Sequence, residues 1–544
     1  MAEHQFSVYL ISSSHMPRNS SIIYLATVTG LLASSALLAV LFGYISVDSW
    51  YYMLLAQALR HGQGCSLHGE YSAVYPCGYP AILALTAPVA KPAVMMISSK
   101  ITNLILLAAS FWFVLKASRH VFMAALIVLN PVTLIIGMYT WSENLLLFCF
   151  CGAVYAISQI HAEDRKWLSY ILLTGFLILG CSARYIFGPF AFLLFLCIWP
   201  AFGRRTALRV FPCFCIAGFA FIIYQLLNHE MTGFATGMPR VAAPEAPLLL
   251  IRQFLIALGV NGLGILVAGL LLTGISIRQL SRVHSGEGTR PAALFVTLAG
   301  FGFLALALVL RLRTQFDPYN TRTIGYGIVL IIAGVVGMLV HIRKQDGMAR
   351  PAILWPVLAM CAAAVFSLAY ADNGALIQSI GDSFDDFQFP ATSLAALKSA
   401  GPPIDAVVYF QLPVSGLDSA NVDNIGEIYY GRDVTLLTPS QGEDGLPETP
   451  AALLHQLDGL ADKRCYFDFT PFATTADFQT YLAGGTLIDR RLIRGAWQDV
   501  LRPNLEPHMR TWLAGVFQPG HQVPCRDILN RPQSRQVLSL SHTG

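Results

Sequence analysis

The sequence predicts a polytopic α-helical membrane protein with about eleven transmembrane helices, followed by a water-soluble α/β domain on the non-cytoplasmic side. Composition gives the first reason: 55% of the 544 residues are hydrophobic and only 12% are charged, proportions that ordinary soluble proteins do not reach. Long apolar runs fill residues 1–372, whereas residues 373–544 have the mixed polarity of a soluble domain. Basic residues also recur in alternate connections between the apolar runs. The bilayer is therefore the main solvent of the first part.

The first apolar run, residues 21–43, follows Arg18 and in this respect looks like a secretory signal. It is about 23 residues long, whereas the apolar core of a signal peptide spans about 7–15 residues. Many further apolar runs follow it along the chain. We therefore expect this run to be the first transmembrane helix.

Ten further apolar runs give the remaining predicted spans. Each is close to the roughly 20 residues that a helix needs to cross the hydrocarbon core. The runs centre near residues 105, 129, 151, 174, 191, 217, 263, 301, 332 and 362.

The short connections on one side of these spans are all basic. They carry Lys116 and Arg119; Arg165 and Lys166; Arg204, Arg205 and Arg209; Arg278, Arg282 and Arg290; and Arg343, Lys344 and Arg350. The positive-inside rule places these connections in the cytoplasm, together with the N-terminus. We expect a multi-pass protein of the inner (plasma) membrane whose residues beyond about 373 are extracytoplasmic. A net charge of +4, dispersed in this way, gives no support for a nucleic-acid partner.

The cysteines divide in the same way as the predicted topology. Seven of the eleven lie in or at the ends of apolar runs, where cysteine behaves as a small hydrophobic residue. The other four are Cys65 and Cys77 in the first outer loop, and Cys465 and Cys525 in the tail. They form two disulfides in an oxidising compartment or remain free thiols, and spacing alone does not decide between these.

Carboxylates and arginines gather on the predicted outer side. These residues are Asp48 at the end of the first helix, Glu143 at the start of the fourth, Arg184 at the start of the sixth, and Arg240, Arg313, Asp317 and Arg322 on outer loops or helix ends. A charge beside a membrane helix marks a function by default, although arginines at helix ends also simply reach toward water. The combination suits group transfer, in which a carboxylate takes a proton and guanidinium groups hold a phosphate leaving group.

The first outer loop, residues 44–99, carries the most information. From Trp50 to Leu59 its apolar and aromatic positions predict a short amphipathic helix lying in the membrane interface, with Asp48 or Ser49 as its N-cap. The prolines of Tyr75-Pro76-Cys77-Gly78-Tyr79-Pro80 then stiffen the return into the membrane.

These segments resemble the first loop of GT-C-fold glycosyltransferases, in particular bacterial relatives of the dolichyl-phosphate-mannose protein mannosyltransferase family. Ser142-Glu143-Asn144-Leu145 resembles the Ser/Thr-Glu segment that begins a helix in those proteins. Ala183-Arg184-Tyr185 resembles their Arg-Tyr or Arg-Pro segment. The resemblance covers roughly residues 21–200, and the later spans match only in hydropathy.

The resemblance implies an inverting glycosyltransferase that moves a sugar from a polyprenyl-phosphate donor to a glycan, lipid or protein acceptor of the cell envelope. It implies that Asp48 is the general base and that Arg184 and Arg322 hold the lipid phosphate. Tyr52, Glu143 and Arg240 complete the expected substrate-binding set. Many relatives have a second acidic residue after the aspartate, but Ser49 follows here, so neither a metal ion nor another cofactor is indicated.

Three other interpretations remain open at this point. A catalytically silent relative acting as a sensor or assembly partner has the same pattern, because fold does not fix function. A transporter requires ionisable residues near the bilayer midplane and often internal repeats, and the sequence shows neither. Asn228-His229-Glu230 contains metal-ligand types, but it lacks a second histidine or carboxylate at helical spacing.

The C-terminal part alternates two kinds of segment. Residues 406–410, 434–437 and 465–469 have strand-like composition, and residues 450–460 and 475–482 are helix-like. This alternation predicts a small α/β domain with a parallel sheet. No glycine-rich phosphate-binding pattern follows a predicted strand. We expect the domain to recognise the acceptor or to act as a lid.

Overall fold

The computed structural model describes most of the predicted membrane part and short pieces of the C-terminal part. The described residues are 18–42, 47–67, 70–90, 92–162, 167–237, 246–280, 289–314, 319, 321–346, 406–410, 433–437, 454, 464–467, 488–493, 496–501, 523–532 and 534. The chain divides into two compact units. The first contains residues 1–42, 71–86 and 97–372, and the second contains residues 43–70, 87–96 and 373–544.

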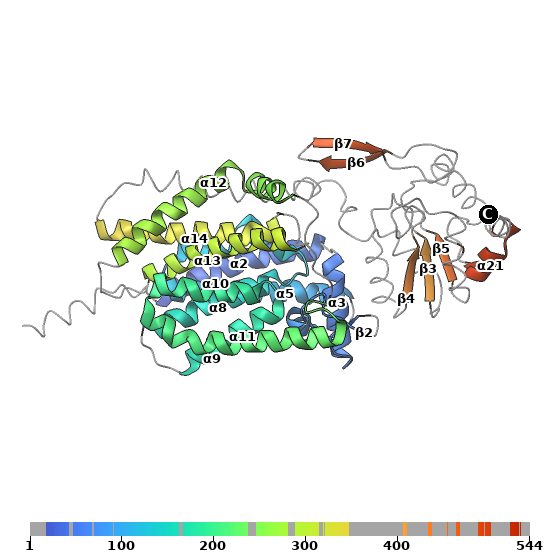
Figure 1. Ribbon diagram of the computed structural model, residues 1–544, viewed down its shortest axis with the longest axis horizontal. Coiled ribbons are helices and arrows are strands. Elements are labelled where there is room, and N and C mark those ends of the chain that lie inside the picture. Colours follow the sequence, from blue (N-terminus) through green and yellow to red (C-terminus); the bar gives the residue numbers. More distant parts are fainter. Residues whose placement is uncertain are drawn as a thin grey trace, which may run out of the picture. The chain divides into compact units, whose positions relative to one another are not determined.

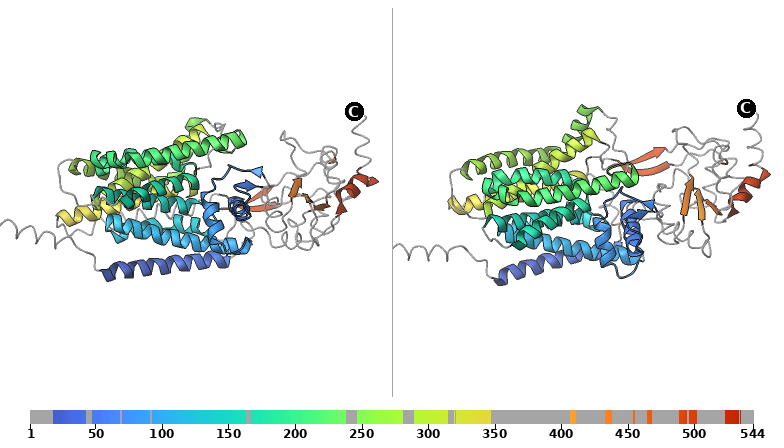
Figure 2. Two further views of the ribbon diagram at one scale, coloured as in Figure 1. Left: turned by 90° about the horizontal axis from the view of Figure 1, so that it is seen from below. Right: turned by 60° about the horizontal axis from the view of Figure 1, so that its bottom comes forward.

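The first unit is a bundle of long helices that run side by side (Figures 1 and 2). The helices that lie in it wholly or largely are α2 (Arg18–Phe42), α4 (Gly78–Thr86), α5 (Pro92–Ser118), α6 (Val121–Val128), α7 (Pro131–Met138), α8 (Glu143–His161), α9 (Trp167–Ala183), α10 (Phe187–Phe202), α11 (Arg204–Thr232), α12 (Pro247–Leu280), α13 (Thr289–Arg313) and α14 (Thr321–Asp346).

Membrane-spanning helices are present where the sequence predicts them. Among the described residues, five helices are long and apolar enough to cross a membrane, and two bent pairs raise this number to seven. Three shorter apolar helices accompany them. The first ten predicted spans all fall on these helices, including the pair α6 and α7, whereas the span near residue 362 lies outside the described residues. The total of eleven stays a prediction.

One predicted span is broken into α6 and α7, which are bent by 42° relative to each other. Pro131 begins α7 and has no N–H to offer to the preceding turn. The buried Asn130 side chain repairs the break. Its Oδ1 accepts from the Thr133 N–H at 3.0 Å, and its Nδ2 donates to the carbonyl oxygens of Leu126 and Ile127, both at 3.0 Å. A single amide thus satisfies backbone groups on both sides of the bend, as the membrane interior requires.

Helix α14 lies at the centre of the bundle, and every residue from Thr323 to Met338 is buried. It packs closely on α13 because small residues face each other. A Cβ added at Gly334 would lie only 2.7 Å from the carbonyl oxygen of Ala293. Such contacts between backbones are typical of membrane helices with small residues at their interface. The packing fixes the position of α14 and therefore of Arg322 at its start.

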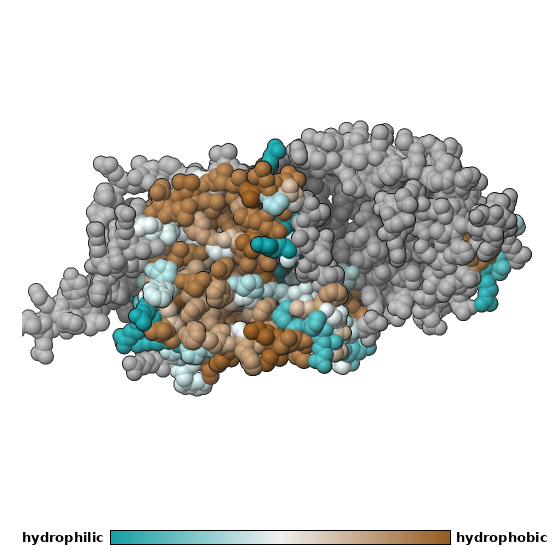
Figure 3. Space-filling model, in the orientation of Figure 1, coloured by the Kyte–Doolittle hydropathy of each residue, from teal (hydrophilic) through white to brown (hydrophobic). Residues whose placement is uncertain are grey.

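Helices α11 and α12 form an apolar outer surface. Their exposed large hydrophobic residues include Leu208, Phe211, Ile216, Phe219, Ile222, Ile223, Leu226, Leu227, Leu248, Leu249, Leu255, Ile256, Val267, Leu270 and Leu271. Hydrophobic residues also dominate the described face of the bundle in Figure 3. A continuous apolar surface of this size suits contact with the hydrocarbon of a bilayer.

The first outer loop differs from the prediction at its start. Helix α2 ends at Phe42, and Asp48 lies in the first turn of a separate helix, α3 (Val47–Arg60), rather than at the end of the first helix. The loop also contains two short strands, β1 (Ser66–Leu67) and β2 (Glu70–Tyr71). All residues from Tyr52 to Ala56 are buried. The interface helix predicted here is therefore covered on more than one side, which its alternation of apolar and aromatic residues alone does not show.

The described pieces of the second unit include a four-stranded sheet in the order β4-β3-β5-β8. Strands β3 (Ala406–Phe410), β4 (Asp433–Leu437) and β5 (Arg464–Phe467) are parallel, as predicted, and β8 (Val523–Pro524) is antiparallel to β5. Strands β6 (Ile488–Ile493) and β7 (Ala496–Leu501) form an antiparallel pair, and a short helix, α21 (Cys525–Asn530), follows β8. Apart from Leu454, the predicted helices lie outside the described residues, and the extracytoplasmic position stays a prediction.

The cysteines follow the division made from the sequence. Cys65, Cys77 and Cys525 are disulfide-bonded. Among the residues that the structure describes, the free thiols are Cys149, Cys151, Cys181, Cys197, Cys213 and Cys215, all from apolar runs. Which cysteine bonds to which stays a prediction.

Candidate functional site

The start of α8 holds a buried carboxylate between two arginines. Glu143 is the first residue of α8 and is 2% exposed. Its Oε1 accepts from Nη1 of Arg184 and from Nε of Arg322. The N-terminal end of a helix also favours a negative charge. Three residues that are far apart in the sequence thus form one ion cluster, named here the Glu143 triad.

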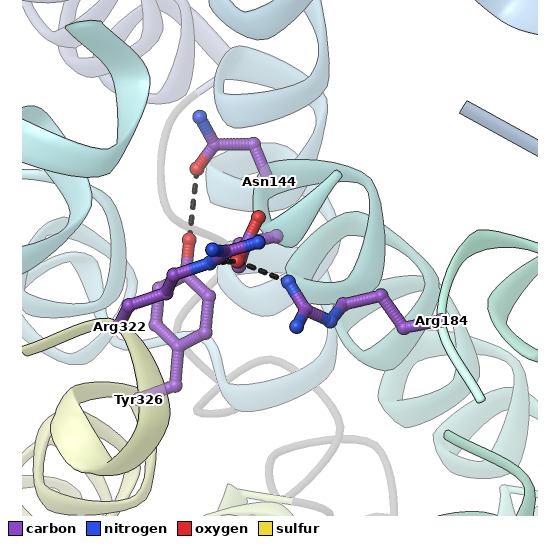
Figure 4. Close-up of polar contacts among 5 residues, drawn as sticks. Asn144, Arg184, Arg322 and Tyr326 are labelled. Carbon is purple, nitrogen blue, oxygen red and sulfur yellow. Dashed lines mark hydrogen bonds and ion pairs between the residues drawn. The ribbon is translucent and has the colours of Figure 1, made fainter. Parts of the chain in front are cut away.

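The two cations of the triad are its accessible part. Arg184 lies in the turn between α9 and α10, and Arg322 is the second residue of α14. Their side chains are 17% and 16% exposed, against 3% for Glu143. Figure 4 shows the side chains of Arg184 and Arg322 reaching toward a common point from different segments of the chain. The triad has a formal charge of +1, and an approaching anion meets the guanidinium groups before the carboxylate.

The segment before α8 holds the Arg322 guanidinium from another side. Its Cζ lies 4.5 Å from the centre of the Trp141 ring, a cation–π contact that favours one orientation of the guanidinium. Trp141 in turn stacks on Tyr139, with ring centres 4.0 Å apart and planes inclined by 7°. An aromatic pair therefore supports the cation.

A second contact fixes α14 against α8. The Tyr326 hydroxyl donates to Oδ1 of Asn144 at 2.9 Å, and both side chains are fully buried (Figure 4). Tyr326 lies one helical turn after Arg322, and Asn144 directly follows Glu143. Residues four apart share a helix face. The two pairs together set the register of α14 on α8, and they fix Arg322 relative to Glu143.

A buried amide near the end of α11 joins three separate segments. Nδ2 of Asn228 donates to the Tyr185 hydroxyl at 3.0 Å, and its Oδ1 accepts from the Tyr71 hydroxyl at 2.7 Å. The Tyr185 hydroxyl donates to the carbonyl oxygen of Ala73 at 2.5 Å. These four residues are named here the Asn228 clamp. Because Tyr185 is the neighbour of Arg184, the clamp holds the turn that carries Arg184.

The hydroxyls of the clamp keep their protons at neutral pH. Burial raises the pKa of Tyr71 above its ordinary value of 10, and the nearby Tyr224 raises it further. Burial is also the main reason that the pKa of Tyr185 is raised, with Tyr224 and Tyr71 adding to the effect. Both groups therefore act as hydrogen-bond donors throughout the physiological range.

Two glycines let the end of the first loop pack directly on this region. A Cβ at Gly78 would lie 2.6 Å from the backbone carbonyl carbon of Ser182. Gly237 has a φ of +72°, and a Cβ there would lie 2.5 Å from the backbone nitrogen of Val74. Only glycine fits this conformation and this approach without strain. The loop return thus rests on backbone of the bundle.

The structure brings together three of the predicted site residues and leaves the others apart. Glu143, Arg184 and Arg322 meet in the triad. The sequence offered no acidic neighbour for Arg184, but its partner comes from another helix, 41 residues away. Asp48, half-buried, and Tyr52, 1% exposed, lie on α3 in the second unit, where their roles stay predictions.

Three further residues predicted on the outer side, Arg240, Arg313 and Asp317, do not join the triad among the described residues. Arg240 and Asp317 lie outside the described residues. Arg313 is exposed at the end of α13. Nothing in the described part of the chain connects it to the triad.

Sequence reasoning missed four residues that support the arginines. Trp141 and Tyr326 have the residue types of an ordinary interface or core position, although Tyr326 follows Arg322 at helical spacing. Asn144 lies inside the quoted Ser142–Leu145 segment. Asn228 is buried, whereas His229 and Glu230 beside it are exposed.

Metal binding receives no support from side-chain geometry. Within the described ranges, no group of three or more histidine, cysteine, aspartate or glutamate side chains is arranged to hold a metal ion. In the segment Asn228-His229-Glu230, the structural role belongs to the Asn228 amide, which forms the hydrogen bonds of the clamp.

Solved structures that are similar to this chain include ArnT and AglB. No family model matches the chain, and no curated protein matches it in sequence. ArnT from Cupriavidus metallidurans, solved with undecaprenyl phosphate, is 7% identical with a TM-score of 0.48, over 87% of this chain and 97% of that one. The archaeal oligosaccharyltransferase AglB from Archaeoglobus fulgidus, solved with an inhibitory peptide and a dolichol-phosphate, is 10% identical with a TM-score of 0.42, over 88% and 74%. Both TM-scores are below 0.5, so neither similarity carries an argument about this chain.

Proposed function

We propose that this chain is a membrane glycosyltransferase that moves a sugar from a polyprenyl-phosphate donor to an acceptor of the cell envelope. The observation that carries the proposal is the Glu143 triad, in which one buried carboxylate holds two arginines at the ends of membrane helices. Guanidinium groups bind phosphate oxygens through paired hydrogen bonds. A phosphate leaving group gains negative charge as its bond to the sugar breaks, and fixed cations stabilise that charge.

The place of the triad suits a lipid phosphate. Glu143 begins α8 and Arg322 lies in the first turn of α14, so the cluster stands where helices leave the apolar part of the bundle. A polyprenyl chain stays in hydrocarbon while its phosphate remains just outside. The apolar faces of α11 and α12 supply a surface for contact with lipid. A transporter is less well supported, because the paired charges lie at helix ends rather than near the midplane.

Glu143 has a positioning role in this proposal. It accepts from one nitrogen of each arginine, and a guanidinium has five N–H donors in a rigid plane. Trp141 and the Tyr326–Asn144 pair further restrict Arg322 and α14. Donors that are oriented before the reaction need no reorganisation when charge develops on the phosphate.

Asp48 is the proposed general base. It takes the proton of the acceptor hydroxyl, whose oxygen then attacks the anomeric carbon from the side opposite the phosphate. The bond between that carbon and the phosphate oxygen breaks, the electron pair leaves with the polyprenyl phosphate, and the configuration inverts. Two facts support this role: Asp48 lies half-buried in the first turn of α3, and its segment resembles the first loop of GT-C-fold enzymes. Ser49 beside it leaves one carboxylate for the task.

The proposed orientation places this chemistry outside the cytoplasm, at the inner membrane. The basic connections between the spans support a cytoplasmic N-terminus. Arg204 and Arg205, at the end of α10 remote from Arg184, are exposed as the rule expects of cytoplasmic residues. A C-terminal domain on the outer side would then lie in the compartment of the acceptor.

Turnover of the Arg184→Lys variant tests the proposal. The purified chain in lipid nanodiscs is incubated with cell-envelope acceptor and a panel of radiolabelled polyprenyl-phosphate hexoses and pentoses. Lysine keeps the charge but loses the planar fork, so we expect turnover of the preferred donor to fall at least about tenfold, the effect of one charged hydrogen bond. Arg204→Lys is the matched control and should stay within about twofold of wild type, because an exposed arginine contributes little.

Two results contradict the proposal. If Arg184→Lys turns over donor as fast as wild type, Arg184 serves only to reach water at the membrane edge. If wild type transfers no sugar from any donor of the panel, the chain is not this kind of enzyme. Mass spectrometry of envelope glycans from a strain lacking the protein identifies the acceptor.

A further inference from the structure

One buried cation plays no part in the site described so far. Lys100 lies on α5 and is 1% exposed. It is among the largest fully buried side chains of the described residues. Within the described residues, its Nζ is buried and has no hydrogen-bond partner. An ammonium group taken out of water without a counter-charge is strongly unfavourable. A buried polar group left in this state calls for an explanation.

The neighbours of Lys100 place it at the same end of the bundle as the Glu143 triad. Ser99 shares a hydrogen bond of 2.8 Å with the Thr140 hydroxyl. Asn103 donates to the carbonyl oxygen of Tyr139 at 3.2 Å. Lys100 lies three residues before Asn103 and shares its face of α5, which packs against the segment that leads directly into Glu143.

Within the first unit, the triad and Lys100 together carry more positive than negative charge when the lysine is charged. The triad has a formal charge of +1, and Lys100 in its charged form raises the total to +2. A phosphate monoester carries about 1.5 to 2 negative charges at neutral pH. A ligand of this class supplies the missing counter-charge, and a polyprenyl phosphate is the product that the proposed reaction releases.

We propose that Lys100 is an anion-binding residue that contacts the phosphate of the polyprenyl lipid, in addition to the two arginines of the triad. This inference rests on the proposed function and extends it by a third cation. In the ligand-free protein the buried Lys100 amine, without a hydrogen-bond partner within the described residues, destabilises the fold. The residue should therefore lower stability in the absence of ligand and raise affinity in its presence.

The variant Lys100→Met separates these two effects. Methionine is unbranched, flexible and apolar, so it fills a similar space without a charge. Lys116→Met is the matched control because Lys116 belongs to the same helix, but is exposed at its other end, 4.3 Å above the Trp112 ring. The full chain in detergent is tested with two probes of equal chain length, farnesyl phosphate and uncharged farnesol.

We expect Lys100→Met to bind farnesyl phosphate roughly ten- to a hundredfold more weakly than wild type, the range for one hydrogen bond to a charged group. Its affinity for farnesol should not change. The thermal midpoint of the ligand-free variant should equal or exceed that of wild type, because an apolar residue replaces a buried charge. Lys116→Met should match wild type in all three measurements.

Three results overturn the inference, and they are distinguishable. Unchanged affinity of Lys100→Met for farnesyl phosphate shows that Lys100 does not touch the phosphate. A large fall in the ligand-free thermal midpoint shows a structural role instead. If wild type does not prefer farnesyl phosphate to farnesol, the proposed function fails together with the inference; if Arg184→Lys loses affinity and Lys100→Met does not, only the inference fails.

Discussion

The two ends of α10 carry arginines in contrasting surroundings. Before its start, Arg184 is 17% exposed and pairs with a buried carboxylate from α8. Beyond its other end, Arg204 and Arg205 are exposed at the first residues of α11. All three residues look alike in the sequence, as charges at the edge of an apolar run. Burial against a carboxylate of α8 distinguishes Arg184 from the exposed arginines at the other end of α10.

The two ends of α10 should also differ in the free energy that is lost when an arginine is replaced. An exposed arginine is hydrated and its interactions are screened by salt, so its replacement changes little. A nearly buried cluster depends on every member, because removing one leaves the other charges poorly solvated. Substitutions at the Arg184 end should therefore have large effects, and matched substitutions at the Arg204 end should have small ones.

The largest effect on activity is expected at Asp48. Replacing it by asparagine removes a general base but preserves a helix cap. Asparagine caps a helix about as well as aspartate, so Asp48→Asn should cost well under about 1 kcal/mol of stability. It cannot accept the proton of the acceptor, and a general base contributes about 10²–10⁴-fold in rate. The variant should express and fold normally but lose nearly all sugar transfer in a membrane assay. Retention of more than roughly a tenth of wild-type turnover would leave Asp48 as a cap and would direct the search for the base to Glu143 or Asp317.

The next effect is on stability at Glu143. In Glu143→Gln, two arginines that are each more than four-fifths buried lose their counter-charge. Breaking a buried ion cluster in this way costs on the order of 3 kcal/mol, which thermal unfolding in detergent would show. Glu230→Gln is the control, because Glu230 is exposed and its replacement should change stability by less than about 0.5 kcal/mol. Equal thermal midpoints for the two variants would mean that the triad does not hold the helices together.

A smaller effect is expected at Asn228, which acts on Arg184 only through Tyr185. Asn228→Ala leaves buried hydroxyls without their partner and should lower stability by about 1–3 kcal/mol. Because the Arg184 turn loosens, KM for the lipid donor should rise several-fold while kcat changes less. Thr232→Ala is the control, since that hydroxyl bonds only to nearby backbone. A loss of stability with unchanged KM would make the clamp purely structural.

The membrane helices could be predicted because crossing a bilayer requires about 20 apolar residues in one run. The break between α6 and α7 could not, because Pro131 stands inside such a run and only Asn130 makes the break tolerable. Asp48 was wrongly placed at the end of the first helix, because it closely follows the apolar run of α2 and no sequence signal separates that run from α3.

The residues of the site could each be predicted from the sequence, but their contact with one another could not. Glu143, Arg184 and Arg322 are recognisable as charges at helix ends. The triad joins residues 41 and 179 positions apart, and no local pattern relates such distant positions. Lys100 escaped notice because a lysine in the first turns of a membrane helix usually reaches toward water. Its burial depends on how α5 packs against the segment before α8.

In the proposed function, Arg184 and Arg322 hold the phosphate of a polyprenyl lipid. A cryo-electron microscopy map of the wild-type chain in nanodiscs, with a saturating concentration of polyprenyl phosphate, tests it most directly. We expect density for a phosphate whose oxygens lie within about 3 Å of both guanidinium groups, the length of charged hydrogen bonds, with the lipid tail running into the bilayer. A well-ordered phosphate bound elsewhere, with Arg184 and Arg322 still paired only to Glu143, would contradict it.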